Sequence, residues 1–317
     1  MSYRSGPVVP GLVLGFLLAS VLEASAGAPG PSPAGGSGAT SLVVESGVGA
    51  DGAGTRRWLE VVRFFHDEDS HRALASVRKP LTEAEARWAA LIRRRAPAWE
   101  RRTEALRVPF GPTEPPPSVL ILLGNFGSED AFAPEDATVA FGLHRLQSNY
   151  GDATDSGNEA RIDRFFDHEF THLLHKAWRR DHDPKIETPL ERALWVCLKE
   201  GIGNYRSLYE KWVRDGELTA HARSVLEDLE PIFAQRISAL EHANEEEAPA
   251  LMKNLSMGPF QKKWGALTVA LWLAQEARGD DRRLRPWVEA GPWGVVELAR
   301  RYLPEDLARG LPKPPEG

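Results

Sequence analysis

The stretch Asn158–Arg180, NEARIDRFFDHEFTHLLHKAWRR, decides the fold of this chain. It contains neither Pro nor Gly, so no residue within it breaks a helix. Apolar side chains recur along it at helical spacing, namely Ile162, Phe165, Phe166, Phe170, Leu173, Leu174 and Trp178. The pattern predicts one long helix that is largely buried.

This helix carries a His-Glu-x-x-His motif at positions 168–172. Residues four apart lie on one face of a helix about one turn from each other, so both imidazoles can reach one metal ion. Glu169 can lean over the open coordination position and accept a proton from a water molecule there. The alternative is a surface helix with solvated His and Glu, and the apolar neighbours argue against it. We therefore predict a zinc site with His168 and His172 as ligands and Glu169 as general base.

A third ligand is expected from another element, because catalytic zinc sites have three protein ligands and one open position. A second helix is predicted to start at Thr188-Pro189-Leu190-Glu191, which joins a capping residue, a proline at the first helical position and a capping-box Glu. Glu200 follows an apolar turn of that helix, where burial of a carboxylate is costly unless it is paired or bound to metal. We predict Glu200 as the third ligand. Two alternatives remain: Glu200 is merely exposed at a helix end, or His175 takes its place.

Neighbours of Glu200 complete the expected site. Gly201 and Gly203 remove side-chain bulk, which lets a second backbone come close. Asn204 lies one turn beyond Glu200 and is expected to hydrogen-bond a ligating imidazole. His175 is otherwise expected to be a core histidine, and the lone Cys197 a small buried hydrophobe.

Composition excludes several classes of protein. The chain has 317 residues, with 45 Asp and Glu against 39 Lys and Arg, and a net charge of −6. This balance argues against a nucleic-acid partner, since phosphate binding needs a basic face. A single cysteine excludes an intramolecular disulfide and a Cys-rich zinc finger.

The first 26 residues have the pattern of an export signal. Arg4 supplies a positive start, Val8 to Leu22 are mostly apolar, and Ala24-Ser25-Ala26 offers a cleavage site. A secreted or periplasmic location follows, and an uncleaved anchor that associates the chain with the envelope is the alternative. Residues 27–54 are rich in Gly, Ala, Ser and Pro, which predicts a flexible linker.

Residues 55–310 are predicted to form one α+β domain, mostly helical, with a small mixed sheet next to the active-site helix. A helical part over 55–117 includes a helix from the Thr82–Glu85 capping box to Leu106, which Pro97 is expected to kink or divide. The part over 118–210 holds two strands, Val119–Leu123 and Thr138–Leu143, together with the zinc-site helices. The part over 211–310 is again helical.

The motif at 168–172, followed 28 positions later by Glu200-Gly201, resembles the gluzincin zinc metallopeptidases, the thermolysin-like clan, and within it bacterial peptidase-MA-like families. The likeness covers most of residues 118–303. It implies a zincin-like fold, zinc bound by His168, His172 and Glu200, and Glu169 as general base. It further implies that the strand Thr138–Leu143 forms a cleft edge to which an extended peptide adds by backbone pairing.

The chain departs from that family at the group that stabilises the oxyanion. Gluzincins present a Tyr or His, and related families often place a Tyr near where Phe260 or Trp264 falls here. Tyr205 is the assigned candidate and Tyr209 a second one, although a Tyr on an apolar helix is commonly a core residue. The Gly-x-Met-Glu-Asn signature of gluzincin aminopeptidases is absent, so an amino-terminal exopeptidase is not favoured.

The sequence therefore predicts a secreted, zinc-dependent peptidase that acts on a peptide or protein substrate. The competing interpretation is a catalytically inactive helical envelope protein with a structural or vestigial metal site.

Overall fold

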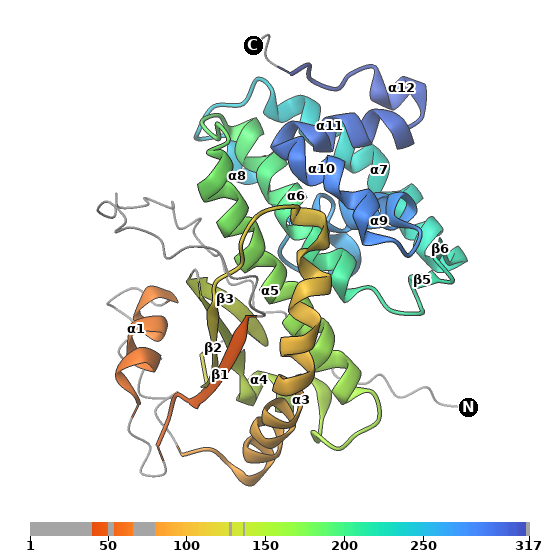
Figure 1. Ribbon diagram of the computed structural model, residues 1–317. Helices are drawn as coiled ribbons and strands as arrows, with labels where there is room; N and C mark the ends of the chain where they lie inside the picture. Colours follow the sequence, from red (N-terminus) through yellow and green to blue (C-terminus); the bar gives the residue numbers. More distant parts are fainter. Residues whose placement is uncertain (1–39, 50–53, 66–79, 127–128, 136, 315–317) are drawn as a thin grey trace, which may run out of the picture. The chain divides into compact units, whose positions relative to one another are not determined.

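The computed structural model describes residues 40–49, 54–65, 80–126, 129–135 and 137–314. Helices dominate, and the main sheet has four strands in the order β1-β2-β4-β3 (Figure 1). β1 (Ser41–Ser46), β2 (Ser118–Gly124) and β4 (Thr138–Gly142) run parallel, whereas β3 (Ala131–Glu135) is antiparallel to β4. The predicted class, a mostly helical α+β domain with a small mixed sheet, is confirmed.

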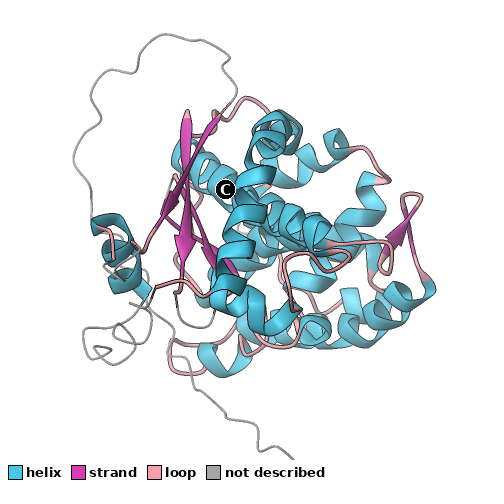
Figure 2. Ribbon diagram, turned by 90° about the horizontal axis from the view of Figure 1, so that it is seen from below, coloured by secondary structure: helices cyan, strands magenta, loops and turns pink. Residues whose placement is uncertain are grey.

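Both faces of the sheet are covered by helices. On one face, Trp58 of α1 (Arg56–Phe65) packs in a cluster with Leu122 of β2 and Ala140 of β4. On the other face, the alternate strand residues join the main core beneath α3 (Glu83–Arg107) and α5 (Asn158–His182). Figure 2 shows the strands side by side, with one helix on one side and most helices on the other. Burial on both faces explains why β2 and β4 are continuous apolar runs.

The prediction of a linker over 27–54 is wrong for its last part. Residues 41–46 form β1, whose backbone pairs with β2 from Ser41↔Ser118 to Ser46↔Leu123. The composition of residues 27–54 did not indicate this six-residue strand, because its partner strand lies far away in the sequence. Residues 27–39 lie outside the described part of the chain, as does the predicted signal segment 1–26.

The expectation that the strand Thr138–Leu143 forms a cleft edge is also wrong. β4 lies inside the sheet between β2 and β3, and Leu143 already belongs to α4 (Leu143–Tyr150). The edge nearest α5 is β3, which packs against that helix. The Ala133 carbonyl of β3 accepts a hydrogen bond from the Lys176 ammonium of α5 at 3.0 Å.

α3 holds α5 against the sheet. It begins at the predicted Thr82–Glu85 capping box and continues unbroken through Pro97. The Trp99 ring stacks on Phe166 at 4.6 Å between centroids, and its Nε1 donates to Asp163 at 2.7 Å. Arg95 and Arg102 of α3 pair with Asp163 and Asp167 of α5.

α6 (Pro189–Ser207) begins at Thr188 with both bonds of the predicted capping box. It packs against α5, α9 and α11. A Cβ on Gly201 would lie 2.5 Å from Val269 of α9, so this glycine permits the close approach of the two helices. The remaining elements are β5 (Val213–Arg214), β6 (Glu217–Leu218), α7 (Ala220–Leu240), α8 (Ala248–Leu251), α9 (Ala266–Ala277), α10 (Arg285–Glu289), α11 (Gly291–Tyr302) and α12 (Glu305–Ala308).

Among the described residues, no helix combines the length and apolar character needed to cross a membrane.

Candidate metal centre

α5 presents two imidazoles from adjacent turns. The His168 and His172 rings lie 4.6 Å apart between centroids and are nearly perpendicular, at 88°. Both side chains are largely buried, and the Nε2 atom of each faces α6. The helical spacing of the motif thus places both donor atoms on one side of α5, as predicted.

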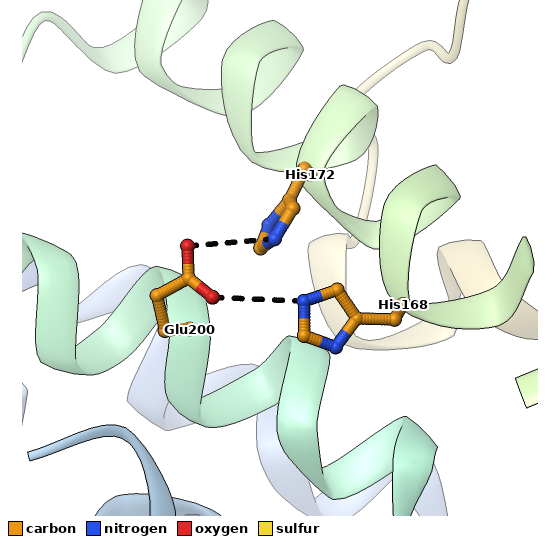
Figure 3. A group of neighbouring side chains, drawn as sticks. All are labelled: His168, His172 and Glu200. Atoms are coloured by element: carbon orange, nitrogen blue, oxygen red, sulfur yellow. Dashed lines mark ion pairs between the residues drawn. The ribbon is translucent and has the colours of Figure 1, made fainter. Parts of the chain in front are cut away.

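α6 brings Glu200 to these nitrogens (Figure 3). Its Oε2 lies 3.6 Å from His168 Nε2, and its Oε1 lies 3.5 Å from His172 Nε2. One donor atom from each residue lies within 4.8 Å of the others, and in the described part of the chain this is the one such group. The three predicted ligands therefore converge, and His175 is not among them.

The spacing of these atoms fits a tetrahedral ion. Bonds of about 2.0–2.1 Å from zinc to nitrogen and oxygen place neighbouring ligand atoms roughly 3.3 Å apart. Each imidazole Nε2 lies 3.5 or 3.6 Å from one of the two Glu200 oxygens, which is close to this value and longer than a good N–H···O hydrogen bond of about 2.7–3.2 Å. Two imidazole nitrogens and one carboxylate oxygen also form a donor set that zinc accepts.

Gly203 keeps the space between the ligands open. A Cβ at this position would lie 3.0 Å from His168 Nε2 and 3.1 Å from His172 Cε1. Any side chain here would therefore press on the two imidazole rings. Gly203 faces the imidazoles, whereas Gly201 faces α9, so the two glycines have different roles.

The partner of His168 is Ser207, which the sequence reasoning missed. Its Oγ lies 3.2 Å from His168 Nδ1 and donates to the Gly203 carbonyl at 3.4 Å. The hydroxyl proton is thus used, so Nδ1–H donates to Ser207 and the Nε2 lone pair is left for a metal. Asn204, expected in this role, instead donates to the backbone carbonyl of Glu200 at 2.7 Å. Ser207 lies seven residues after Glu200 on the same face, which is the signal that could have identified it.

Burial sets the protonation of Glu169. It raises the pKa of this carboxyl to about 7, helped by the negative charge of Glu200 and opposed by His168. A pKa near neutrality suits a general base. Glu169 is 8% exposed and lies on the same turn as His168.

The three ligands respond differently to burial. Burial lowers the pKa of His172 to about 4. Burial disfavours the charged form of His168 too, but the interaction with the Glu200 carboxylate and the charge of Glu169 raise its pKa overall. Burial also opposes ionisation of Glu200, yet the neighbouring His172 and Lys199 hold its pKa well below the usual value. The Glu200 carboxyl is therefore ionised, which is the form that binds metal.

The structure turns Tyr205, the predicted oxyanion donor, away from Glu200. Its hydroxyl donates to Asp281 at 2.8 Å. Five helical residues at about 100° each also place Tyr205 roughly 140° around α6 from Glu200. The other candidate, Tyr209, is exposed, and its ring lies under the Arg164 guanidinium at 5.2 Å.

His175 and Cys197 are core residues, as expected. His175 Nδ1 lies 3.2 Å from the Thr171 carbonyl, and its ring packs edge-on against Phe110 and Trp195. Cys197 is fully buried, and burial raises the pKa of its thiol.

Two cations near the ligands were not foreseen from the sequence. The Lys199 ammonium lies 3.3 Å from Glu200 Oε1. Lys263, before α9, is close enough for its charge to lower the pKa of His168.

Comparison with known protein families, with curated proteins and with solved structures finds no match to this chain.

Proposed function

We propose that this chain is a zinc-dependent peptidase of the gluzincin type. The observation that supports this best is the convergence of His168 Nε2, His172 Nε2 and the Glu200 carboxylate, with the buried Glu169 next to the first ligand. A structural zinc site is usually closed by four protein ligands, whereas three donors leave a position for water or substrate.

The proposed reaction assigns one task to each residue. A zinc ion held by His168, His172 and Glu200 would supply Lewis acidity at the scissile carbonyl. Glu169 accepts a proton from the attacking water and passes it to the leaving amine. Ser207 keeps His168 in the tautomer that exposes Nε2.

The peptide is proposed to pair with β3. β3 is the edge strand of the described sheet that packs against α5, and it pairs with β4 on its inner side. Glu129, two residues before β3, is close enough for its charge to raise the pKa of Glu169. The beginning of β3 therefore lies near the general base, where an extended substrate could add by backbone pairing. The predicted export signal would place this activity in a secreted or periplasmic setting.

The competing candidate is an inactive envelope protein with a structural or vestigial metal site. The bond between Tyr205 and Asp281 supports it, because the residue assigned to the oxyanion is occupied elsewhere.

Metal analysis and one substitution separate the two candidates. The purified full chain should retain about one zinc per molecule. It should digest an unbiased peptide library and lose this activity with a chelator.

Glu169→Gln should retain zinc and lower turnover by 100-fold or more, since it removes the proton acceptor. Glu227→Gln, on the exposed side of α7, is the matched control and should change neither property. Hydrolysis that survives Glu169→Gln would reject the mechanism, and zinc without any hydrolysis would favour the inactive protein.

A further inference from the structure

We propose that Lys199 is a positioning residue for the candidate metal centre: its ammonium contacts the Glu200 carboxylate and fixes it in the orientation that faces the two imidazoles. This inference rests on the metal-binding part of the proposed function and not on hydrolysis. Lys199 Nζ lies 3.3 Å from Glu200 Oε1, the oxygen that is also 3.5 Å from His172 Nε2. The opposite oxygen, Oε2, lies 3.6 Å from His168 Nε2.

The direction of the Lys199 side chain is informative. Successive residues on a helix project about 100° apart and do not face each other. A lysine on α6 would ordinarily extend its charged end into water, because its stem is long and its ammonium strongly hydrated. The Lys199 ammonium instead lies beside the carboxylate of the next residue, Glu200, and 31% of the Lys199 side chain remains exposed. The ammonium thus contacts a ligand even though solvent is within reach.

The surrounding charges account for this direction. Glu169 is buried and Glu200 is partly buried, and their charges repel each other, which adds to the effect of burial in raising the Glu169 pKa. The Lys199 charge acts on both carboxyls and on His172. Lys199 therefore offsets the cost of placing two carboxylates together, and its contact fixes the orientation of the Glu200 carboxylate.

Positioning and bare charge predict opposite effects on metal binding. An ammonium near a divalent cation repels it, so removal of that charge alone should tighten binding. Removal of a contact that orients a ligand should weaken binding, by about 10- to 100-fold for groups of this kind. Lys263 provides the comparison, because its charge reaches His168 but no contact joins it to a ligand among the described residues.

The test is a cobalt titration of the full chain, followed by visible absorption and by competition with a chelator. Lys199→Met should weaken cobalt binding by 10- to 100-fold. Lys199→Arg, which keeps a cation at this position, should bind cobalt within about threefold of the unmodified chain. Lys263→Met should bind cobalt as tightly as the unmodified chain or more tightly, and the exposed Lys262→Met should be unchanged. Thermal unfolding of each apo variant confirms that the fold is retained.

Several outcomes would overturn the inference. Equal or tighter binding by Lys199→Met would show that the lysine acts only as a charge. Equal weakening by Lys199→Met and Lys263→Met would show that the contact has no special role. If the unmodified chain binds no cobalt, this inference and the proposed function fail together. If the expected pattern appears in a chain that hydrolyses no peptide, the peptidase assignment alone fails.

Discussion

At the scale of single residues, the ligand set could be predicted and its supporting contacts could not. His168, His172 and Glu200 follow from helical spacing and from the cost of burying a carboxylate. The contacts of Ser207 and Lys199 depend on side-chain directions, which residue types alone do not fix, and the Tyr205 hydroxyl contacts Asp281 on another face of α6. The chemistry of the site was thus readable from residue types, while its details depend on how α5 and α6 face each other.

Gly203 gives a sharp prediction at this scale. Gly203→Ala should weaken zinc binding about 10-fold or more, because the new methyl group would stand 3.0 Å from His168 Nε2. The apo protein should be as stable as before or slightly more stable, since Ala favours a helix by about 1 kcal/mol over Gly. Zinc competition with a chelator and thermal unfolding measure the two effects.

Gly201→Ala is the control for that experiment. Its methyl group would meet Val269 at 2.5 Å, so it should lower the melting temperature by disturbing the contact of α6 with α9. Zinc affinity that is unchanged in Gly203→Ala would contradict the role given to this glycine.

At the scale of elements, local signals predicted α3, α5 and α6 but not the order of the sheet. The capping boxes at Thr82 and Thr188 are both formed, since cap and acidic partner are three residues apart and need no distant contact. β1 and the interior place of β4 depend on pairing between segments far apart in sequence, which no local pattern encodes. Pro97 was expected to kink or divide the helix, and α3 is not divided there.

Trp99 joins α3 to α5 through a ring stack and a hydrogen bond. Trp99→Ala should lower the free energy of unfolding by about 3–5 kcal/mol, because it leaves a cavity between Phe166 and Phe141 and frees a partner of Asp163. Trp99→Phe should cost less, since an aromatic ring is kept. Urea unfolding measures both, and Arg101→Ala on the exposed side of α3 should stay within about 0.5 kcal/mol of the unmodified protein.

At the scale of the whole molecule, the fold class was predicted because composition and helical periodicity are properties of long stretches. The metal centre joins two helices that are distinct in sequence, so its occupancy should stabilise the entire domain. An ion that binds only the folded chain adds RT ln(1 + [L]/Kd), which is about 2.7 kcal/mol at one hundred times Kd.

Zinc should therefore raise the melting temperature of the apo protein, by roughly 2 °C or more for a domain of this size. His172→Ala should abolish most of this shift, because two donors hold the ion poorly. Differential scanning calorimetry with stepwise zinc additions provides the measurement, and magnesium at the same concentration is the control. A shift of equal size in His172→Ala would mean that the stabilising ion binds elsewhere.

The pairing of β1 with β2 has a consequence for the time course of folding. Ser41 and Ser118 are register partners, although 77 positions separate them in the chain. At a synthesis rate of about 5–20 residues per second, residues 41–46 must wait roughly 4 to 15 seconds before their partner strand has been made. During that interval their backbone amides and carbonyls lack the ladder that later satisfies them. The earliest-made strand of the sheet is therefore completed only after β2 emerges, so a chaperone or a competing strand has several seconds in which to occupy it first.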